Sequence, residues 1–313
     1  MPANLAGGGP YALVVRARLL LPLGALAATW PFVEPQLPVL RRVRVPVLGA
    51  GAAPIRVLQL SDLHLLPRHL RRAAWVRQLG SVEPDLIVST GDHWSAAAAL
   101  DLLSTTLGAL TAGGTPAVFV PGNNDYFTPT RPSLADYLRG GGEPVRRRAD
   151  LPWSAAAAAL EHVGWTDLTQ RRLTLQVAGR SLTVTGTDDG HLRRDRYAQV
   201  AGPVDGLGLG VTHTPARRLL RRFAADGHAL VLAGHTHGGQ LRVPGLGALV
   251  TNSDLERSRA RGLSRNSPGG RANGGPGWLH VSAGLGTSPY APVRLCCRPE
   301  ATLLELVPDG RVR

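Results

Sequence analysis

Five short apolar runs in this chain each end in polar residues that can bind a ligand. They read IRVLQLSDLH, DLIVSTGDH, AVFVPGNND, LGLGVTHT and ALVLAGHTHGG, and they lie between residues 55 and 239. Apolar, β-branched runs of this length predict buried strands, and the helical patterns at 71–82 and 95–110 separate the first three. Strands that alternate with helices predict an α/β layered fold, in which ligands bind at the carboxyl ends of the strands.

The later part of the chain has a different pattern. Residues 171–189 alternate apolar and polar side chains on both sides of Gly179, which predicts a β-hairpin. The stretches WLHVSAGLG and ATLLELVP predict further strands near the C-terminus. Two segments rich in glycine and arginine, 139–152 and 257–277, are predicted to be loops.

The N-terminal region contains an uncharged apolar stretch, Leu19–Val33, which follows two arginines. It is shorter than the ~20 residues that a membrane-spanning helix needs. It fits a signal peptide, with ALA at 25–27 as a cleavage site, or a short anchor, and the alternative is a segment packed on the domain. We therefore expect an N-terminal signal or anchor with its lead-in at 1–50, one catalytic domain at 51–313, and a membrane-associated or exported protein rather than a cytoplasmic one.

The charge of the chain is strongly basic. Its net charge is +13 and all the basic residues are arginines, which favours anionic partners such as phosphate esters, an anionic membrane surface or nucleic acid. Aromatic residues make up only 5% of the chain, so the stacking surfaces that bind single-stranded nucleic acid are scarce and a nuclease is the weaker interpretation. The two cysteines are adjacent, which suits neither an ordinary disulfide nor a metal site. The oligomeric state cannot be inferred.

The polar residues at the strand ends form a set of metal-binding types. Asp-x-His and His-x-His place two side chains on the same side of an extended backbone. Oxygen and imidazole donors in this mixture suit Mn, Fe or Zn better than Ca. The set comprises two aspartates, one asparagine and four histidines, namely Asp62, His64, Asp92, Asn123, His213, His235 and His237.

The order of these motifs, D-x-H, G-D, G-N-x-D, H and G-H-x-H, resembles the calcineurin-like metallophosphoesterase superfamily. The resemblance runs from about residue 55 to the C-terminus, and GHTHGGQ and SAGLGTSPYAPVR are similar to its bacterial envelope-associated branch. It implies a four-layer αββα sandwich of two mixed β-sheets flanked by helices. It also implies two divalent or mixed-valence metal ions and a metal-bridging hydroxide that hydrolyses a phosphoester.

Carried over position by position, the resemblance assigns each expected ligand to a metal. Asp62, His64 and His237 would hold the first ion. Asn123, His213 and His235 would hold the second, and Asp92 would bridge the two.

The sequence departs from the family pattern at Asn124, where family members commonly carry a histidine that assists the leaving group. An amide donates a hydrogen bond but cannot deliver a proton, and loss of general-acid assistance costs ~10²–10⁴ in rate. We expect His93, directly after Asp92, or the metal ions alone to compensate, with Asp125 and His191 as weaker alternatives.

The resulting prediction is a metal-dependent phosphodiesterase or pyrophosphatase. Its substrate would be a small-molecule, nucleotide-linked or lipid-linked phosphoester of the cell envelope. The alternatives are a catalytically weak metal-binding scaffold, which Asn124 keeps open, and a nuclease.

Overall fold

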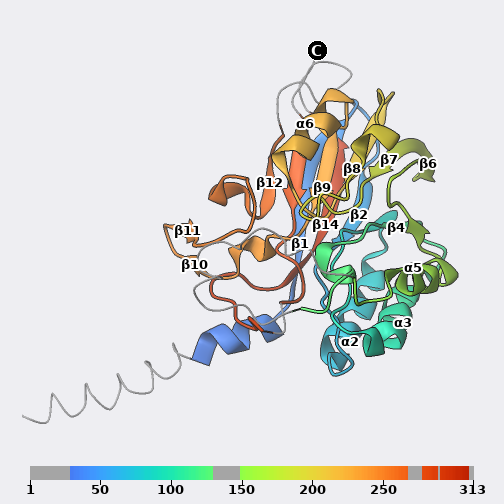
Figure 1. Ribbon diagram of the computed structural model, residues 1–313. Coiled ribbons are helices and arrows are strands. Elements are labelled where there is room, and N and C mark those ends of the chain that lie inside the picture. Colours follow the sequence, from blue (N-terminus) through green and yellow to red (C-terminus); the bar gives the residue numbers. More distant parts are fainter. Residues whose placement is uncertain (1–28, 130–148, 267–276, 288–289, 310–313) are drawn as a thin grey trace, which may run out of the picture.

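The computed structural model describes residues 29–129, 149–266, 277–287 and 290–309, and two mixed six-stranded sheets form its centre (Figure 1). The first sheet has the order β1 (Val39–Leu48), β14 (Glu300–Pro308), β2 (Ile55–Leu60), β3 (Leu86–Ser89), β4 (Ala117–Phe119) and β5 (Thr166–Asp167). The second has the order β12 (Gly262–Arg265), β13 (Trp278–Val281), β9 (Leu230–Ala233), β8 (Leu207–Val211), β7 (Arg180–Gly186) and β6 (Arg171–Val177).

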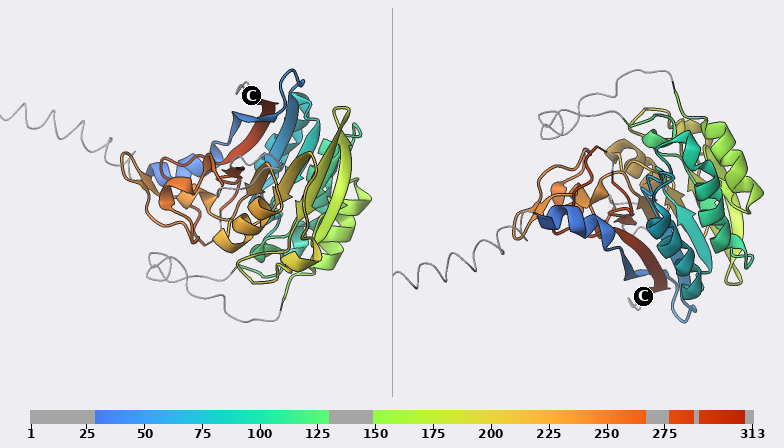
Figure 2. Two further views of the ribbon diagram at one scale, coloured as in Figure 1. Left: turned by 90° about the horizontal axis from the view of Figure 1, so that it is seen from above. Right: turned by 90° about the horizontal axis from the view of Figure 1, so that it is seen from below.

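Helices cover the outer face of each sheet, as Figure 2 shows for the first sheet. Helices α2 (Leu70–Gln78), α3 (Leu100–Thr111) and α5 (Trp153–His162) share one apolar core with β2, β3 and β4. Helix α6 (Arg217–Ala225) packs on β9 and β13 of the second sheet through a separate core. The predicted four-layer αββα sandwich is therefore confirmed.

The inner faces of the two sheets share the remaining core. Val88 and Val118 of the first sheet are fully or almost fully buried against Val211 and Leu232 of the second. One polar residue also crosses this interface: the Gln59 amide donates to the Ala233 carbonyl at 2.9 Å and accepts from a ring nitrogen of His280 at 2.7 Å. Since a buried, satisfied polar contact has one geometry, it fixes how the ends of β2 and β9 face each other.

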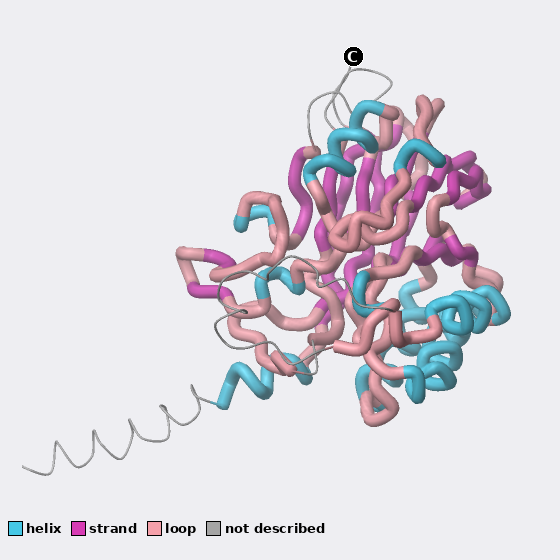
Figure 3. Tube along the Cα trace, in the orientation of Figure 1, coloured by secondary structure: helices cyan, strands magenta, loops and turns pink. Residues whose placement is uncertain are grey.

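Strand β2 and its neighbours β3 and β4 are parallel, as are β7, β8, β9 and β13, so their carboxyl ends meet at one edge of the sandwich. Figure 3 shows the strands of both sheets running into a group of loops there. The predicted hairpin is present as β6 and β7, with Ala178 and Gly179 both at positive φ in its turn.

Two expectations about segments need correction. Residues 39–48 form β1, which pairs in parallel with β14, so a boundary after residue 50 cuts an edge strand off the folded domain. The segment 257–277, predicted to be a loop, contains the 3₁₀ turn Arg257–Arg259 and strand β12.

At the N-terminal end of the described residues, 29–33 are helical. The expected cleavage site at 25–27 lies outside the described residues. Within the described residues, no helix combines the length and the apolar character that crossing a bilayer requires.

Candidate metal centre

The expected ligands come from five strand ends and converge between the sheets. Asp62 and His64 follow β2, Asp92 follows β3, and Asn123 follows β4 in the short 3₁₀ turn Asn123–Asp125. His213 follows β8, and His235 and His237 follow β9. Ligand atoms of four of them, Asp62, His64, Asp92 and His237, all lie within 4.8 Å of one another.

The first group surrounds the two imidazoles of His64 and His237. Their Nε2 atoms are 3.3 Å apart, and the rings are stacked with centroids at 5.1 Å. The Nε2 atom of His237 lies 3.6 Å from an Asp62 carboxylate oxygen, and that of His64 lies 3.4 Å from Asp92 Oδ2. Two ring nitrogens and two carboxylates thus point at one small volume.

The second group shares Asp92 with the first. His213 Nε2 lies 3.4 Å from the same Oδ2 atom of Asp92 and 3.3 Å from His235 Nδ1. Asp92 Oδ2 is therefore equally distant from a histidine of each group, which is the position of a bridging ligand. The side-chain oxygen of Asn123 is buried and has no hydrogen-bond partner among the described residues, although a buried polar atom of this kind normally has one.

In three of the four imidazoles, a backbone carbonyl at the far ring nitrogen fixes the tautomer of the neutral ring. His213 Nδ1 faces the Thr90 carbonyl at 2.7 Å, His237 Nδ1 faces the Gly286 carbonyl at 3.1 Å, and His235 Nε2 faces the Asn252 carbonyl at 3.1 Å. A carbonyl only accepts, so each of these nitrogens carries the hydrogen and the opposite nitrogen presents a lone pair to the centre. The far nitrogen of His64, Nδ1, lies 3.1 Å from the hydroxyl of Ser95, which can donate or accept.

In both groups two ring nitrogens face each other at 3.3 Å. Lone pairs that face each other without a proton between them repel, whereas a cation between them binds both. Together with the unpartnered Asn123 oxygen, this shows that the donor set fits metal ions.

The electrostatics favour a charged Asp92 and the neutral form of three imidazoles, those of His64, His235 and His237. Burial lowers the pKa of His64 to about 4 and holds the pKa of His237 well below its usual value. Burial, with the neighbouring His213, also lowers the pKa of His235 to about 4. Burial opposes ionisation of Asp92, but the charge and hydrogen bond of His213 outweigh it and keep the pKa of Asp92 well below its usual range.

His213 and Asp62 have pKa values shifted in the opposite sense. Burial disfavours the charged form of His213, but Asp92 and Asp62 outweigh it and raise its pKa well above the usual value. Burial raises the pKa of Asp62 to about 6. Protons on these two groups must leave before a cation binds, so acid competes with metal for this site.

The backbone at the ligands adopts conformations that are uncommon for residues other than glycine. Five of the seven expected ligands have positive φ: Asp62 (50°), His64 (44°), Asp92 (56°), His235 (71°) and His237 (50°). Such conformations cost energy and persist where the surroundings impose them, often at functional sites.

Glycines allow the loops to approach each other closely. A Cβ atom on Gly122 would lie 2.2 Å from Asp92 Oδ1, and one on Gly234 would lie 1.9 Å from the Ser61 hydroxyl oxygen. Neither position has room for a side chain, so the glycines of these motifs are required for the packing of the site.

Asn124 contacts the expected bridging ligand directly. Its backbone N–H donates to Asp92 Oδ1 at 2.8 Å and its side-chain amide donates to Asp92 Oδ2 at 2.7 Å. The amide therefore orients the carboxylate.

Asp125, expected at most to be a weak substitute acid, is completely buried beneath Asp92. Its carboxylate accepts from the backbone N–H groups of Asp92 (2.9 Å), His93 (2.8 Å) and Gly122 (2.8 Å), and from His93 Nδ1 (2.9 Å). It joins the loop after β3 to the loop after β4. Its spacing from Asn123 predicted a turn, and no local signal could reveal partners on a different strand end.

His93 has no free ring nitrogen. Its Nδ1 is bound to Asp125, its Nε2 lies 2.9 Å from the Ser89 hydroxyl, and its ring stacks on Trp153. It is fully buried. His191, in contrast, is half-buried with its ring centroid 5.1 Å from that of His235.

Arg294 was not predicted to support the site. It is fully buried, and its terminal nitrogens donate to the carbonyls of Ala283, Gly284 and Gly286 and to that of His237. It thereby holds the loop after β13 against the turn that carries His237. An arginine in a Gly- and Pro-rich stretch gives no sequence signal of burial.

Known proteins match this chain in sequence and in structure. The sequence profile described as calcineurin-like phosphoesterase matches residues 55–239. The chain is 29% identical to phosphodiesterase YaeI of Escherichia coli (strain K12) over 94% of this chain and 100% of that protein. It is 25% identical to the uncharacterized protein YpbG of Bacillus subtilis (strain 168) over 80% of this chain and 84% of that one. The solved structure of TT1561 from Thermus thermophilus matches 74% of this chain and 91% of its own, with 13% identity and a TM-score of 0.42.

Proposed function

Because the chain belongs to the calcineurin-like phosphoesterase family, we propose that it is a metal-dependent phosphodiesterase with a dinuclear centre. The observation that carries the proposal is the position of Asp92 Oδ2, 3.4 Å from both His64 and His213, between two pairs of imidazole nitrogens that face each other. A single ion needs one such pair, and the presence of two with a shared carboxylate supports two ions.

The residues expected to hold the ions are Asp62, His64 and His237 for one, Asn123, His213 and His235 for the other, and Asp92 for both. When bound, such a pair polarises the phosphoryl group and lowers the pKa of a water molecule, which supplies the nucleophile. The ions are expected to be Mn, Fe or Zn, because the site offers four imidazole nitrogens, whereas Mg and Ca sites use oxygen ligands.

The chain itself orients these groups. Carbonyl acceptors keep the hydrogens of three of the four imidazoles on the far nitrogens. The amide of Asn124 and the backbone contact of Asp125 hold Asp92 in place. Preorganisation of this kind removes the need for rearrangement during reaction.

Whether the leaving group needs a proton decides which substrates the site can hydrolyse. Asn124 has no acidic proton, and the ring nitrogens of His93 are held by Asp125 and Ser89. Of the expected substitutes this leaves His191, whose ring lies beside that of His235. A leaving group that is stable as an anion needs no proton, and a phosphate monoester, with a pKa of about 6, is such a group. This supports a phosphodiester with a good leaving group or a pyrophosphate linkage, in a small-molecule or lipid-linked substrate.

Hydrolysis of bis(p-nitrophenyl) phosphate by the full chain with Mn²⁺ tests the proposal. We expect turnover that stops when a chelator is added and returns with Mn²⁺. The Asp92→Ala variant should lose it, whereas Asp101→Ala, at an exposed position of α3, should keep it. Stoichiometric metal binding without turnover with Mn, Fe or Zn would instead identify a metal-binding scaffold.

A further inference from the structure

The exposed apolar side chains of this protein are concentrated in three segments. Eight large hydrophobic residues are exposed among the described residues, and Leu70 is the one outside these segments. The segments are 29–38, 240–248 and 290–298. The seven side chains in them are Trp30, Phe32, Val33, Leu37, Val243, Leu246 and Tyr290.

Hydrogen bonds join the three segments into one surface. Arg294 N–H donates to the Pro31 carbonyl at 2.9 Å, and Arg242 N–H donates to the Leu295 carbonyl at 2.9 Å. The Gln240 amide donates to the Ala291 carbonyl at 3.0 Å. Figures 1 and 2 show the N-terminal helix and the hairpin of β10 (Arg242–Val243) and β11 (Gly247–Ala248) at the same end of the molecule. We call the seven side chains on these segments the apolar face.

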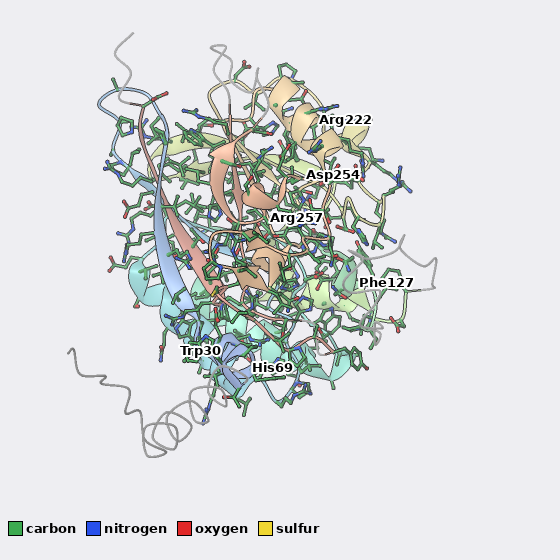
Figure 4. All side chains as sticks on the ribbon, turned by 90° about the vertical axis from the view of Figure 1, so that its left-hand side faces the viewer. Trp30, His69, Phe127, Arg222, Asp254 and Arg257 are labelled. Atoms are coloured by element: carbon green, nitrogen blue, oxygen red, sulfur yellow. The ribbon has the colours of Figure 1, made fainter. Side chains whose placement is uncertain are left out.

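The apolar face is held in place from beneath. Glu34 is 2% exposed, and its carboxylate accepts from the N–H groups of Cys296 (2.9 Å) and Cys297 (2.5 Å) and from the Trp30 indole (3.0 Å). Figure 4 places Trp30 at the opposite end of the molecule from Arg222 of α6. The contacts of Glu34 therefore fix Trp30 and hold segment 29–38 on segment 290–298, which lowers the entropic cost of binding.

The exposed and half-buried charged side chains of the three segments are all positive. Glu34 is the single carboxylate in the sequence of the three segments, and it is buried. Arg298 is exposed beside Leu37, whose carbonyl it contacts at 2.8 Å, and Arg242 is half-buried next to Val243. Apolar and aromatic groups with arginines and without exposed acids match the interface of an anionic bilayer.

The apolar face also adjoins the metal centre. Gln240 N–H donates to the His237 carbonyl at 3.1 Å, and Arg294, which follows Tyr290 by four residues, donates to the same carbonyl at 3.4 Å. A bilayer bound at this face would therefore lie against the same segments that hold His237.

We propose that the apolar face docks on the surface of a lipid bilayer that contains anionic lipids. The tip of the β10–β11 hairpin, where Leu246 is 76% exposed, and Phe32, 60% exposed, enter the headgroup region. The uncharged sequence at 19–28 directly precedes the face, which is consistent with the same partner. Docking through Leu246 is separate from any attachment by those residues, because the hairpin lies far from them along the chain.

A fluorescent label on Leu246→Cys tests the docking in the full chain. Cys296 is exposed, so the label is placed in a Cys296→Ser background, where Cys297 is buried. A matched variant carries the label at Gly113→Cys, after α3, where an added side chain meets nothing within 4 Å. Both proteins are mixed with vesicles of phosphatidylglycerol and phosphatidylcholine, and with phosphatidylcholine vesicles alone.

We expect a blue shift of the label at 246 with the anionic vesicles and none at 113. Removal of one of the large side chains that enter the headgroup region, by Phe32→Ser or Leu246→Ser, should weaken vesicle binding about tenfold. An unshifted label at 246 on protein that sediments with the vesicles would overturn the proposal, because attachment would then use residues 1–28 alone. A shift that depends on protein concentration without vesicles would also overturn it and identify a second copy of the chain as the partner. Neither readout depends on hydrolysis.

Discussion

The Asp125→Asn substitution tests whether the loops that carry the centre are held by one buried carboxylate. Three donors meet its Oδ2 atom, namely the N–H groups of Asp92 and Gly122 and Nδ1 of His93, and the His93 N–H meets Oδ1. An asparagine of the same shape offers one oxygen. If that oxygen takes the Oδ2 position, its NH₂ group faces the backbone N–H of His93, and a buried donor is left without an acceptor.

The expected loss follows from these contacts. A buried unsatisfied polar group costs about 1–3 kcal/mol, and three hydrogen bonds that were made to a charged acceptor become bonds to a neutral one, which are roughly half as strong. We expect the free energy of unfolding to fall by about 2–4 kcal/mol. Because Asp92 is displaced, metal affinity should also fall by about 10–100-fold, as for other residues that orient a ligand.

Urea denaturation and Mn²⁺ titration of the full chain measure both effects. The control is Glu161→Gln, which removes a carboxylate at an exposed position of α5 and should change neither quantity appreciably. An Asp125→Asn protein with the stability and Mn²⁺ affinity of the unmodified chain would show that this carboxylate does not hold the two loops.

Three further substitutions test the contact of Asn124 with Asp92, the close packing at Gly122 and the burial of His280. Asn124→Ala removes a hydrogen bond to Asp92 and should lower Mn²⁺ affinity about 10–100-fold without unfolding the chain, which calorimetry and circular dichroism together measure. Gly122→Ala puts a Cβ atom 2.2 Å from Asp92 Oδ1 and should abolish phosphodiester hydrolysis, whereas Gly113→Ala should not. His280, whose pKa burial lowers from 6.5 to about 4, takes up a proton in the unfolded chain first, so stability should fall as the pH drops from 6.5 through 4. The loss should approach roughly 3 kcal/mol. His280→Asn should reduce the slope of that part of a pH series of urea melts by the share of one proton, because His64 and His235 also have pKa values of about 4. A variant that keeps the full slope would contradict this assignment.

Five of the strands could be predicted, because the same sequence pattern marks each of them. Apolar runs that end in a Gly, Asp, Asn or His predicted β2, β3, β4, β8 and β9, because buried parallel strands are apolar along their whole length. β1 was missed because it carries three arginines and Pro46. An edge strand that pairs on one side tolerates such residues, and its partner β14 lies at the other end of the chain, where local reasoning does not reach.

The expected ligands could be chosen from motif order, but their supporting contacts could not. The hydrogen bonds from His213 to Thr90 and from His237 to Gly286 join different strands and depend on the packing of the sheets. The same holds for His93, which appeared suited to proton transfer because it follows Asp92. The fold turns its ring away toward Asp125 and Trp153, and adjacent side chains on a strand end point to opposite sides.

The number of metal ions bound by the full chain, and their coupling, tests the dinuclear centre most directly. We would remove metal with a chelator, add Mn²⁺, measure the metal content of the protein, and record its electron paramagnetic resonance spectrum. A dinuclear centre bridged by Asp92 should give two Mn²⁺ per chain with the spectrum of an exchange-coupled pair, and Asp92→Ala should lose that coupling. One Mn²⁺ per chain, or two with uncoupled spectra, would contradict the bridging role of Asp92.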